Sequence, residues 1–226
     1  MPAARMPLPT QPPAPVPLVE RYRIPAGEAQ SELVVKNSVF IGSIGAAATV
    51  AEAERLIAEV RARYADAHHN AWAYKIGPTA QDLIGFSDDG EPGGTAGRPM
   101  LAVLEGSGIC QIVAVVTRYF GGTKLGTGGL VRAYGGAVRE ALKDLPTVEK
   151  VLHYVVGFRV DYGLYGTLRY LLPKYNVIPR DEQFAQDVTL KIAIPYDRLS
   201  EMQELLRELT QGRVLFAADR MAWCYL

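Results

Sequence analysis

The chain has no excess of charge of either sign, because 24 Lys and Arg residues balance 24 Asp and Glu residues. One large basic surface is therefore not expected, although a local basic patch is compatible with this balance. Only two cysteines occur, Cys110 and Cys224, which excludes a disulfide framework and a four-cysteine zinc site. No apolar run approaches the ~20 residues needed to cross a bilayer. These features predict a soluble protein of the reducing cytoplasm.

Apolar residues are plentiful, at 49% of 226 residues, so a packed core in one large or two small domains is expected. Proline is concentrated at the start, with seven of the first 17 residues. That density favours extended polyproline II and interrupts the apolar stretch that a signal peptide needs. Residues 1–19 are predicted to form a disordered tail, with a docking segment for a proline-binding domain as the alternative.

Residues 20–146 are predicted to form a first domain of class α+β. The pattern indicates a hairpin over 31–44, a helix after a capping box at Thr49 and Glu52, and strands over 71–76 and 82–86. A short helix near Pro99, a strand buried on both faces over 109–116 and an amphipathic helix over 130–142 follow. Strands and helices in this order predict an α/β sandwich.

Residues 149–226 are predicted to form a second domain. Strands are expected over 153–160, 176–184, 187–194 and 213–218, with helices over 162–175 and 199–209. The order β-α-β-β-α-β is that of the ferredoxin-like split βαβ fold. This fold supports too many activities to indicate a function. His153, on its first strand, is expected to be structural, and Cys110 of the first domain to be a buried core thiol.

Two segments, 86–99 and 117–130, are richer in glycine than a turn requires. The second joins a buried strand to a helix, whose free N–H groups and positive dipole end favour a phosphate group. Thr127 is predicted to be the N-cap of this helix. The spacing is neither that of a Walker loop nor that of a dinucleotide fingerprint. The alternative is that these glycines only form tight turns and close helix contacts.

Basic and aromatic residues accompany the second segment. Tyr119 follows Arg118 directly, and such a pair can stack on a base while the cation meets phosphate. The alternative is that one of the two aromatic residues, Tyr119 and Phe120, belongs to the core and that the ring of the other covers the surface. The residues predicted to contact phosphate or nucleic acid are Arg98, Arg118, Tyr119, Gly121, Gly122, Thr123, Lys124, Gly126, Thr127, Gly128 and Arg132.

A second group, His68, His69, Asp88, Asp89 and Glu91, is predicted to line a possible pocket. The carboxylates can bind Mg²⁺ or act as acid and base, or else form a turn in which Arg98 pairs with a carboxylate. Adjacent residues of an extended chain point to opposite faces, so the histidines are not expected to share a metal. No catalytic residue, cofactor or metal is predicted.

Three stretches of the sequence resemble the YigZ/IMPACT family: HHNAWAY over 68–74, DDGEPGGTAGRP over 88–99 and RYFGGTKLGTGGL over 118–130. The resemblance covers nearly everything after the proline-rich segment. It implies a first domain related to a small-subunit ribosomal-protein domain and to domain IV of elongation factor G. It also implies a ferredoxin-like second domain similar to domain V of that factor.

The resemblance further implies a role in translation. Eukaryotic IMPACT regulates translation by competing for a partner that activates a stress kinase, but its partner-binding domain has no counterpart here. We therefore expect a non-enzymatic protein that binds RNA or the ribosome, with a protein partner from the translation machinery as a further possibility. The alternatives are an enzyme acting on a phosphorylated or nucleotide small molecule, with or without Mg²⁺, and a protein-interaction module.

Overall fold

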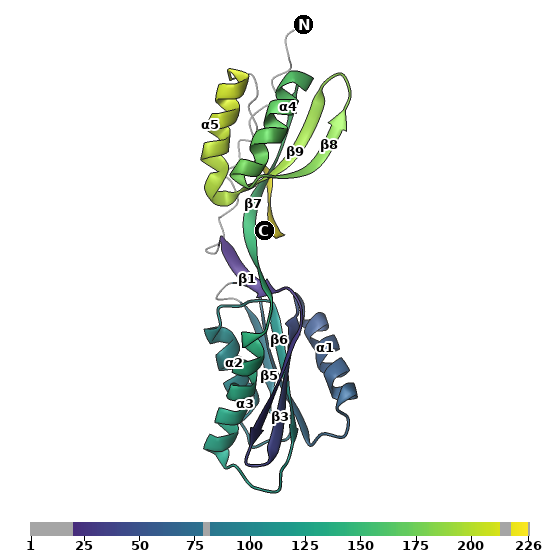
Figure 1. Ribbon diagram of the computed structural model, residues 1–226, viewed down its shortest axis with the longest axis vertical. Coiled ribbons are helices and arrows are strands. Elements are labelled where there is room, and N and C mark those ends of the chain that lie inside the picture. Colours follow the sequence, from purple (N-terminus) through teal and green to yellow (C-terminus); the bar gives the residue numbers. More distant parts are fainter. Residues whose placement is uncertain (1–19, 79–81, 213–217, 226) are drawn as a thin grey trace. The chain divides into compact units, whose positions relative to one another are not determined.

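The computed structural model describes residues 20–78, 82–212 and 218–225, and the chain forms two compact units (Figure 1). The first unit is Tyr22–Glu149, and the second comprises Lys150–Leu226 with the described residues before Tyr22. Both units mix helices and strands, as expected from the sequence. The predicted tail at 1–19 lies outside the described residues. Within the described part of the chain, no helix is long and apolar enough to cross a membrane.

The first unit is an antiparallel sheet with helices on both faces (Figure 1). Its elements are β1 (Arg21–Pro25), β2 (Ala29–Val35), β3 (Ser38–Ala46), α1 (Val50–Arg63), β4 (His69–Ile76), β5 (Leu83–Ser87), α2 (Gly97–Gly106), β6 (Ile112–Tyr119) and α3 (Thr127–Lys143). The sheet order is β2-β3-β6-β4-β5. One face packs on α1 and the other on α2 and α3, which confirms the predicted sandwich.

The central strand β6 positions the polar segment that follows it. Alternate residues of β6 enter the two cores: Val113 and Val115 pack toward α1, while Ala114 and Val116 pack toward α2 and α3. This confirms the prediction of a strand buried on both faces. The strand also continues beyond the apolar run to Tyr119. A loop of residues 120–126 then leads from the centre of the sheet to α3.

Two local signals in the sequence are realised in the backbone. The Thr49 hydroxyl accepts a hydrogen bond from the Glu52 amide at 3.2 Å and caps α1, as predicted. The Glu52 carboxylate accepts from the Ala48 amide, one residue earlier than a standard capping box requires. Between β2 and β3, Lys36 and Asn37 have φ values of 45° and 67°. Positive φ at both turn residues matches the twist of the flanking strands and closes a tight hairpin.

The second unit has the predicted β-α-β-β-α-β order. Its elements are β7 (Thr147–Val160), α4 (Tyr162–Leu171), the 3₁₀ helix η1 (Leu172–Tyr175), β8 (Ile178–Phe184), β9 (Val188–Pro195), the 3₁₀ helix η2 (Tyr196–Arg198), α5 (Leu199–Thr210) and β10 (Ala218–Tyr225). The sheet runs β1-β7-β9-β8, and β10 also pairs with β7. Within it, the antiparallel run β10-β7-β9-β8 is the ferredoxin-like arrangement. The last strand was expected over 213–218. Residues 213–217 lie outside the described residues, and β10 begins at Ala218.

Two residues expected to be structural are buried. Cys110 lies in the first unit as a buried free thiol. His153 of β7 is fully buried, with Nδ1 2.9 Å from the Val151 carbonyl oxygen. A carbonyl can only accept, so Nδ1 carries the proton. Burial lowers the pKa of His153, which keeps this imidazole neutral near pH 7.

A candidate phosphate-binding hollow

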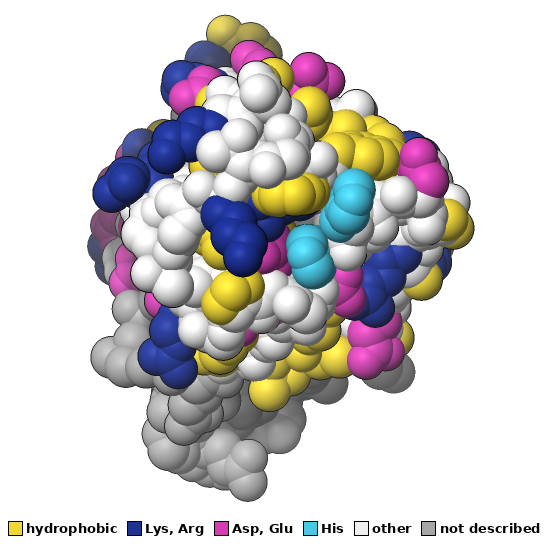
Figure 2. All heavy atoms as spheres, turned by 90° about the horizontal axis from the view of Figure 1, so that it is seen from below, with side chains coloured by type: hydrophobic (Ala, Val, Ile, Leu, Met, Phe, Trp, Pro, Cys, Tyr) yellow, Lys and Arg dark blue, Asp and Glu magenta, His cyan; other side chains and the backbone are white. Residues whose placement is uncertain are grey.

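Both glycine-rich segments and both adjacent histidines contribute to one hollow in the first unit, here named the β6–α3 hollow. Its volume is about 480 Å³, and it is lined by His68, His69, Glu91, Pro92, Arg118, Phe120, Lys124, Leu125, Gly126, Thr127 and Leu130. Figure 2 shows an end of the first unit where histidine, basic, acidic and hydrophobic side chains lie beside one another. The hollow therefore has polar, charged and apolar walls.

The start of α3 forms one wall of the hollow. The predicted N-cap, Thr127, is wrong: Gly126 is the cap and Thr127 is the first helical residue. Gly126 has φ 70°, a conformation that a β-branched residue such as threonine rarely adopts. Among the described residues no side chain caps this end. The first N–H groups of a helix have no acceptor within it, so this end favours an anion.

Arg118 is a buried cation rather than a free surface charge. It is 5% exposed, and its Nη1 donates to Glu91 Oε1 at 2.6 Å. The guanidinium carbon lies 5.4 Å from the centre of the Phe40 ring and 5.5 Å from that of Phe120. Its Nε is buried and has no hydrogen-bond partner within the described parts of the chain. Glu91 therefore balances the charge of Arg118, while one N–H donor remains unused.

Glu91 joins the polar groups at the base of the hollow. Its Oε1 accepts hydrogen bonds from both Arg118 and the Tyr134 hydroxyl, each at 2.6 Å. Burial raises the pKa of Tyr134, and the hydrogen bond to Glu91 raises it further. The phenol therefore remains a donor to the carboxylate. The result is a buried, charge-balanced network that fixes Arg118 in place.

The two histidines carry their protons on opposite ring nitrogens. Nδ1 of His69 lies 2.8 Å from the Asp89 carbonyl oxygen, which only accepts, so Nδ1 is protonated and Nε2 is an acceptor in the neutral ring. Nδ1 of His68 accepts from the Phe120 amide at 3.2 Å, so Nε2 carries the proton. The hollow is thus lined by one donor imidazole and one acceptor imidazole.

The expectation that these adjacent side chains face opposite ways is wrong, because both line the same hollow. The alternation rule applies only within a strand. Strand β4 begins at His69, and His68 lies in the loop before it.

The carboxylates of the first glycine-rich segment hold the backbone in place. Asp88 accepts hydrogen bonds from the amides of Gly94, Ala96 and Gly97 at 2.7–2.9 Å. Asp89 pairs with Arg61 rather than with Arg98 and also accepts from an amide of β4. Among the described residues no group of three His, Cys, Asp or Glu residues is arranged to hold a metal ion. These contacts favour the turn interpretation over the Mg²⁺ interpretation.

Asp88 makes the stability of the first unit sensitive to acid. Burial alone raises the pKa of Asp88, but the three amide hydrogen bonds and the charge of Arg98 outweigh it and hold the pKa below 3.8. The stabilisation is therefore complete above the ordinary pKa of a carboxyl group and is lost as the pH falls through the lowered value. The variant Asp88→Asn is expected to lose about 1–2 kcal/mol of unfolding free energy at pH 7.

Urea unfolding at pH 7 and at acid pH measures this effect. The difference in unfolding free energy between the wild type and Asp88→Asn is expected to become smaller as the pH falls. Glu54→Gln, on the exposed side of α1, is the control and leaves stability unchanged. A difference that stays constant down to strongly acid pH would contradict the stabilising role of the ionised Asp88 carboxylate.

The other predicted contact residues are distributed over several places. Tyr119 does not line the hollow; its hydroxyl donates to Asp66 at 2.8 Å. Phe120, which was not among the predicted contact residues, supplies the aromatic wall instead. Arg98 lies on α2, 5.5 Å from the centre of the Phe86 ring, away from the hollow. The loop glycines, Gly121 and Gly122, together with Thr123 and Gly128, stand close by in sequence without lining the hollow.

A smaller hollow of about 160 Å³ adjoins the first, because Leu125 lines both. It contains the predicted Arg132 and also Lys36, which the sequence analysis missed. The hairpin between β2 and β3 brings Lys36 to this place. The only sequence signal for this was the Lys-Asn-Ser break within the predicted hairpin.

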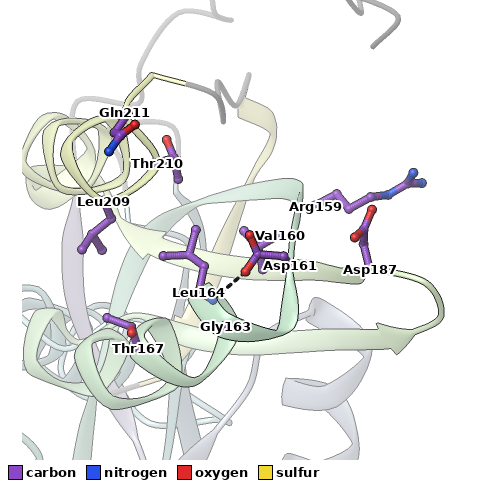
Figure 3. Close-up of a pocket in the computed structure, with 10 residues that line it drawn as sticks. All are labelled: Arg159, Val160, Asp161, Gly163, Leu164, Thr167, Asp187, Leu209, Thr210 and Gln211. Atoms are coloured by element: carbon purple, nitrogen blue, oxygen red, sulfur yellow. Dashed lines mark hydrogen bonds between the residues drawn. The ribbon is translucent and has the colours of Figure 1, made fainter. Parts of the chain in front are cut away.

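The second unit contains another hollow, of about 650 Å³ (Figure 3). It is lined by Arg159, Val160, Asp161, Gly163, Leu164, Thr167, Asp187, Leu209, Thr210 and Gln211. Asp161 caps α4 through a hydrogen bond from the Leu164 amide at 2.8 Å. Two aspartates face a single arginine in this lining set. This balance of charges does not favour an anion in the second hollow.

Comparison with known proteins places the β6–α3 hollow in a recognised domain. Residues 36–142 match the Impact N-terminal domain, and residues 158–213 match a domain of unknown function, DUF1949. The chain is 37% identical to "IMPACT family member YigZ" of Escherichia coli (strain K12), covering 88% of this chain and 98% of the relative. It is 36% identical to "IMPACT family member YvyE" of Bacillus subtilis (strain 168), covering 83% and 85%.

A solved structure described as "Crystal structure of an hypothetical protein" is also similar. It is 37% identical to this chain and superimposes with a TM-score of 0.61. The match covers 89% of this chain and 98% of the solved one. Both units therefore have counterparts in a single known structure.

Proposed function

The chain belongs to the IMPACT family, and we propose that it is a non-enzymatic RNA-binding protein that associates with the ribosome and modulates translation. The observation that carries the RNA-binding part is the uncapped start of α3 beside the exposed Lys124 in one hollow. Uncapped amides and a lysine together suit a phosphate oxygen. The translation part rests on the family resemblance.

The charges around the hollow support contact with more than one phosphate. Lys36, Lys124 and Arg132 are exposed and form no ion pair with any described residue. Two of them line the smaller hollow, which shares Leu125 with the larger one. A backbone that crosses both hollows meets positive charge along its way. The zero net charge of the chain predicts modest affinity that falls steeply with salt.

Removing two of these lysines tests the proposal. Lys36→Ala with Lys124→Ala is expected to weaken binding of a 12-nucleotide single-stranded RNA roughly tenfold at low salt. The slope of log affinity against log salt is expected to become shallower by about 1–2, because fewer counterions are released. Fluorescence anisotropy at several salt concentrations measures both.

Lys143→Ala is the matched control, since Lys143 lies in the last turn of α3 and pairs with Glu140. Its binding and salt slope are expected to equal those of the wild type. Identical affinity of the double variant and the wild type would reject this surface as the RNA contact.

A further inference from the structure

The chemistry of the walls points to a particular part of the RNA. We infer that the β6–α3 hollow holds one unstacked nucleotide of a single-stranded RNA. Its phosphate lies at the start of α3 and its base against Phe120 and Leu125. The inference rests on the proposed RNA binding. It adds that a single nucleotide enters the hollow and that an RNA duplex does not bind there in the same way.

The apolar wall suits a nucleotide base. Contact with a phosphate backbone alone needs only cations and amides, yet Pro92, Phe120, Leu125 and Leu130 also line the hollow. The Phe120 ring is 41% exposed. An accessible aromatic ring beside an anion site is the arrangement in which a base stacks while its phosphate is held. A duplex keeps its bases stacked inside, so it does not present a base to this wall.

Arg118 forms a fixed, buried part of the same wall. The start of a helix alone does not define a ligand site, but here a buried cation and an exposed aromatic ring, Arg118 and Phe120, line the same hollow. Arg118 is 5% exposed, and Nε has no acceptor among the described residues. Because Nε has almost no accessible surface, a ligand in the hollow does not reach it. Arg118 instead provides a fixed support behind the Phe120 ring, 5.5 Å from its centre.

The pair of histidines suits a ribose hydroxyl. In the neutral rings, Nε2 of His68 is a donor, while Nε2 of His69, which lies 3.9 Å from Glu91 Oε1, is an acceptor. A ribose hydroxyl is both donor and acceptor, and it can use either nitrogen. The 2′-hydroxyl is the group that distinguishes RNA from DNA. The His68 ring also contacts Phe120 edge-on, with 6.4 Å between ring centres, which couples the aromatic wall to the histidines.

Size limits the ligand to about one nucleotide. A volume of about 480 Å³ falls within the range of roughly 300–1,000 Å³ typical of small-molecule pockets. The adjoining hollow of about 160 Å³, with Lys36 and Arg132, is suited to the next phosphate rather than to a second base. The strand can therefore continue beyond the bound nucleotide, which distinguishes RNA from a free mononucleotide.

The experiment compares probes of one sequence and length with the full chain by fluorescence anisotropy. Single-stranded RNA is expected to bind about tenfold more tightly than the blunt RNA duplex, because only the single strand offers a base for stacking. Single-stranded DNA is expected to bind about fivefold more weakly than RNA, since one hydrogen bond is lost. Free uridine monophosphate is expected to compete only at much higher concentration.

Variants of the aromatic wall complete the test. Phe120→Ala is expected to lower the affinity for the single strand about tenfold and to leave the affinity for the duplex unchanged. Phe120→Trp is expected to keep the preference for single-stranded over duplex RNA, because tryptophan also stacks on a base. A ring that served only in packing would not require this result. Val131→Ala, at an exposed position of α3 outside the hollow, is the control and is expected to bind as the wild type does. Circular dichroism verifies that each variant is folded.

The outcomes separate this inference from the proposed function. Equal binding of duplex and single strand, with no effect of Phe120→Ala, overturns the inference and leaves backbone binding by the basic residues intact. Tight uridine monophosphate binding without RNA binding overturns both and identifies a small-molecule site. Binding of no probe overturns both as well.

Discussion

Glu91→Ala is expected to lower the free energy of unfolding of the first unit by about 3–5 kcal/mol. The Glu91 side chain is 3% exposed and that of Arg118 is 7% exposed, so water does not replace the lost contact. Removing the carboxylate leaves a buried guanidinium without a counter-charge and the Tyr134 hydroxyl without its acceptor. Urea unfolding of the full chain, followed by circular dichroism, measures the loss.

Removing both charges together distinguishes the contribution of the ion pair to stability from that of side-chain packing. The double variant Glu91→Leu with Arg118→Met is expected to be more stable than Glu91→Ala, because no unpaired charge remains. The exposed pair formed by Lys143 and Glu140 provides the matched control. Glu140→Ala is expected to cost less than about 1 kcal/mol. Equal losses for Glu91→Ala and Glu140→Ala would contradict a buried network at the hollow.

The second large effect is expected at Gly121, where the loop after β6 touches the turn between β2 and β3. A Cβ atom at Gly121 would lie 2.0 Å from the carbonyl carbon of Asn37 and 2.4 Å from the amide nitrogen of Ser38. Both atoms belong to the backbone and cannot rotate away. The Gly121 amide also donates to the Ser38 hydroxyl at 3.1 Å. Gly121→Ala is therefore expected to destabilise the first unit by about 3 kcal/mol or more.

Gly128→Ala is the same substitution at a position with space. Its Cβ would have Arg132 as its nearest neighbour at 3.9 Å, and Gly128 lies in the first turn of α3. This variant is expected to gain up to about 1 kcal/mol, since alanine loses less backbone entropy in a helix. Thermal unfolding compares the two. A Gly121→Ala melting temperature equal to that of the wild type would show that the loop and the turn are not in this close contact.

The sequence predicts the elements of the core better than the polar contacts at its edge. The apolar run at 109–116 indicates a buried strand, yet β6 continues to Tyr119. Thr117 and Arg118 remain buried there because Asn70 and Glu91 bind them. These partners are 47 and 27 residues away, so no local pattern reveals them. The same distance explains why Arg118, predicted as a phosphate contact, is found in an ion pair.

The errors at the site have a common cause in the local backbone path. Thr127 has the side chain of an N-cap, but the chain enters α3 through a positive φ that suits Gly126. The two histidines were expected to diverge, but the strand begins only at the second of them. Phe120, rather than Tyr119, meets the hollow because β6 ends between them. The spacing of residues in the sequence predicts the face to which a side chain points only where the ends of the strand or helix are known.

The most direct test of the hollow as a phosphate site is an NMR titration of the ¹⁵N-labelled full chain. A 5′-phosphorylated single-stranded RNA tetranucleotide is added at low salt, and amide shifts are followed. The largest changes are expected at Thr127, Gly128 and Gly129 in the first turn of α3, with Phe120 close behind. Changes confined to the second unit, or an unchanged first turn of α3 at saturation, would contradict the account.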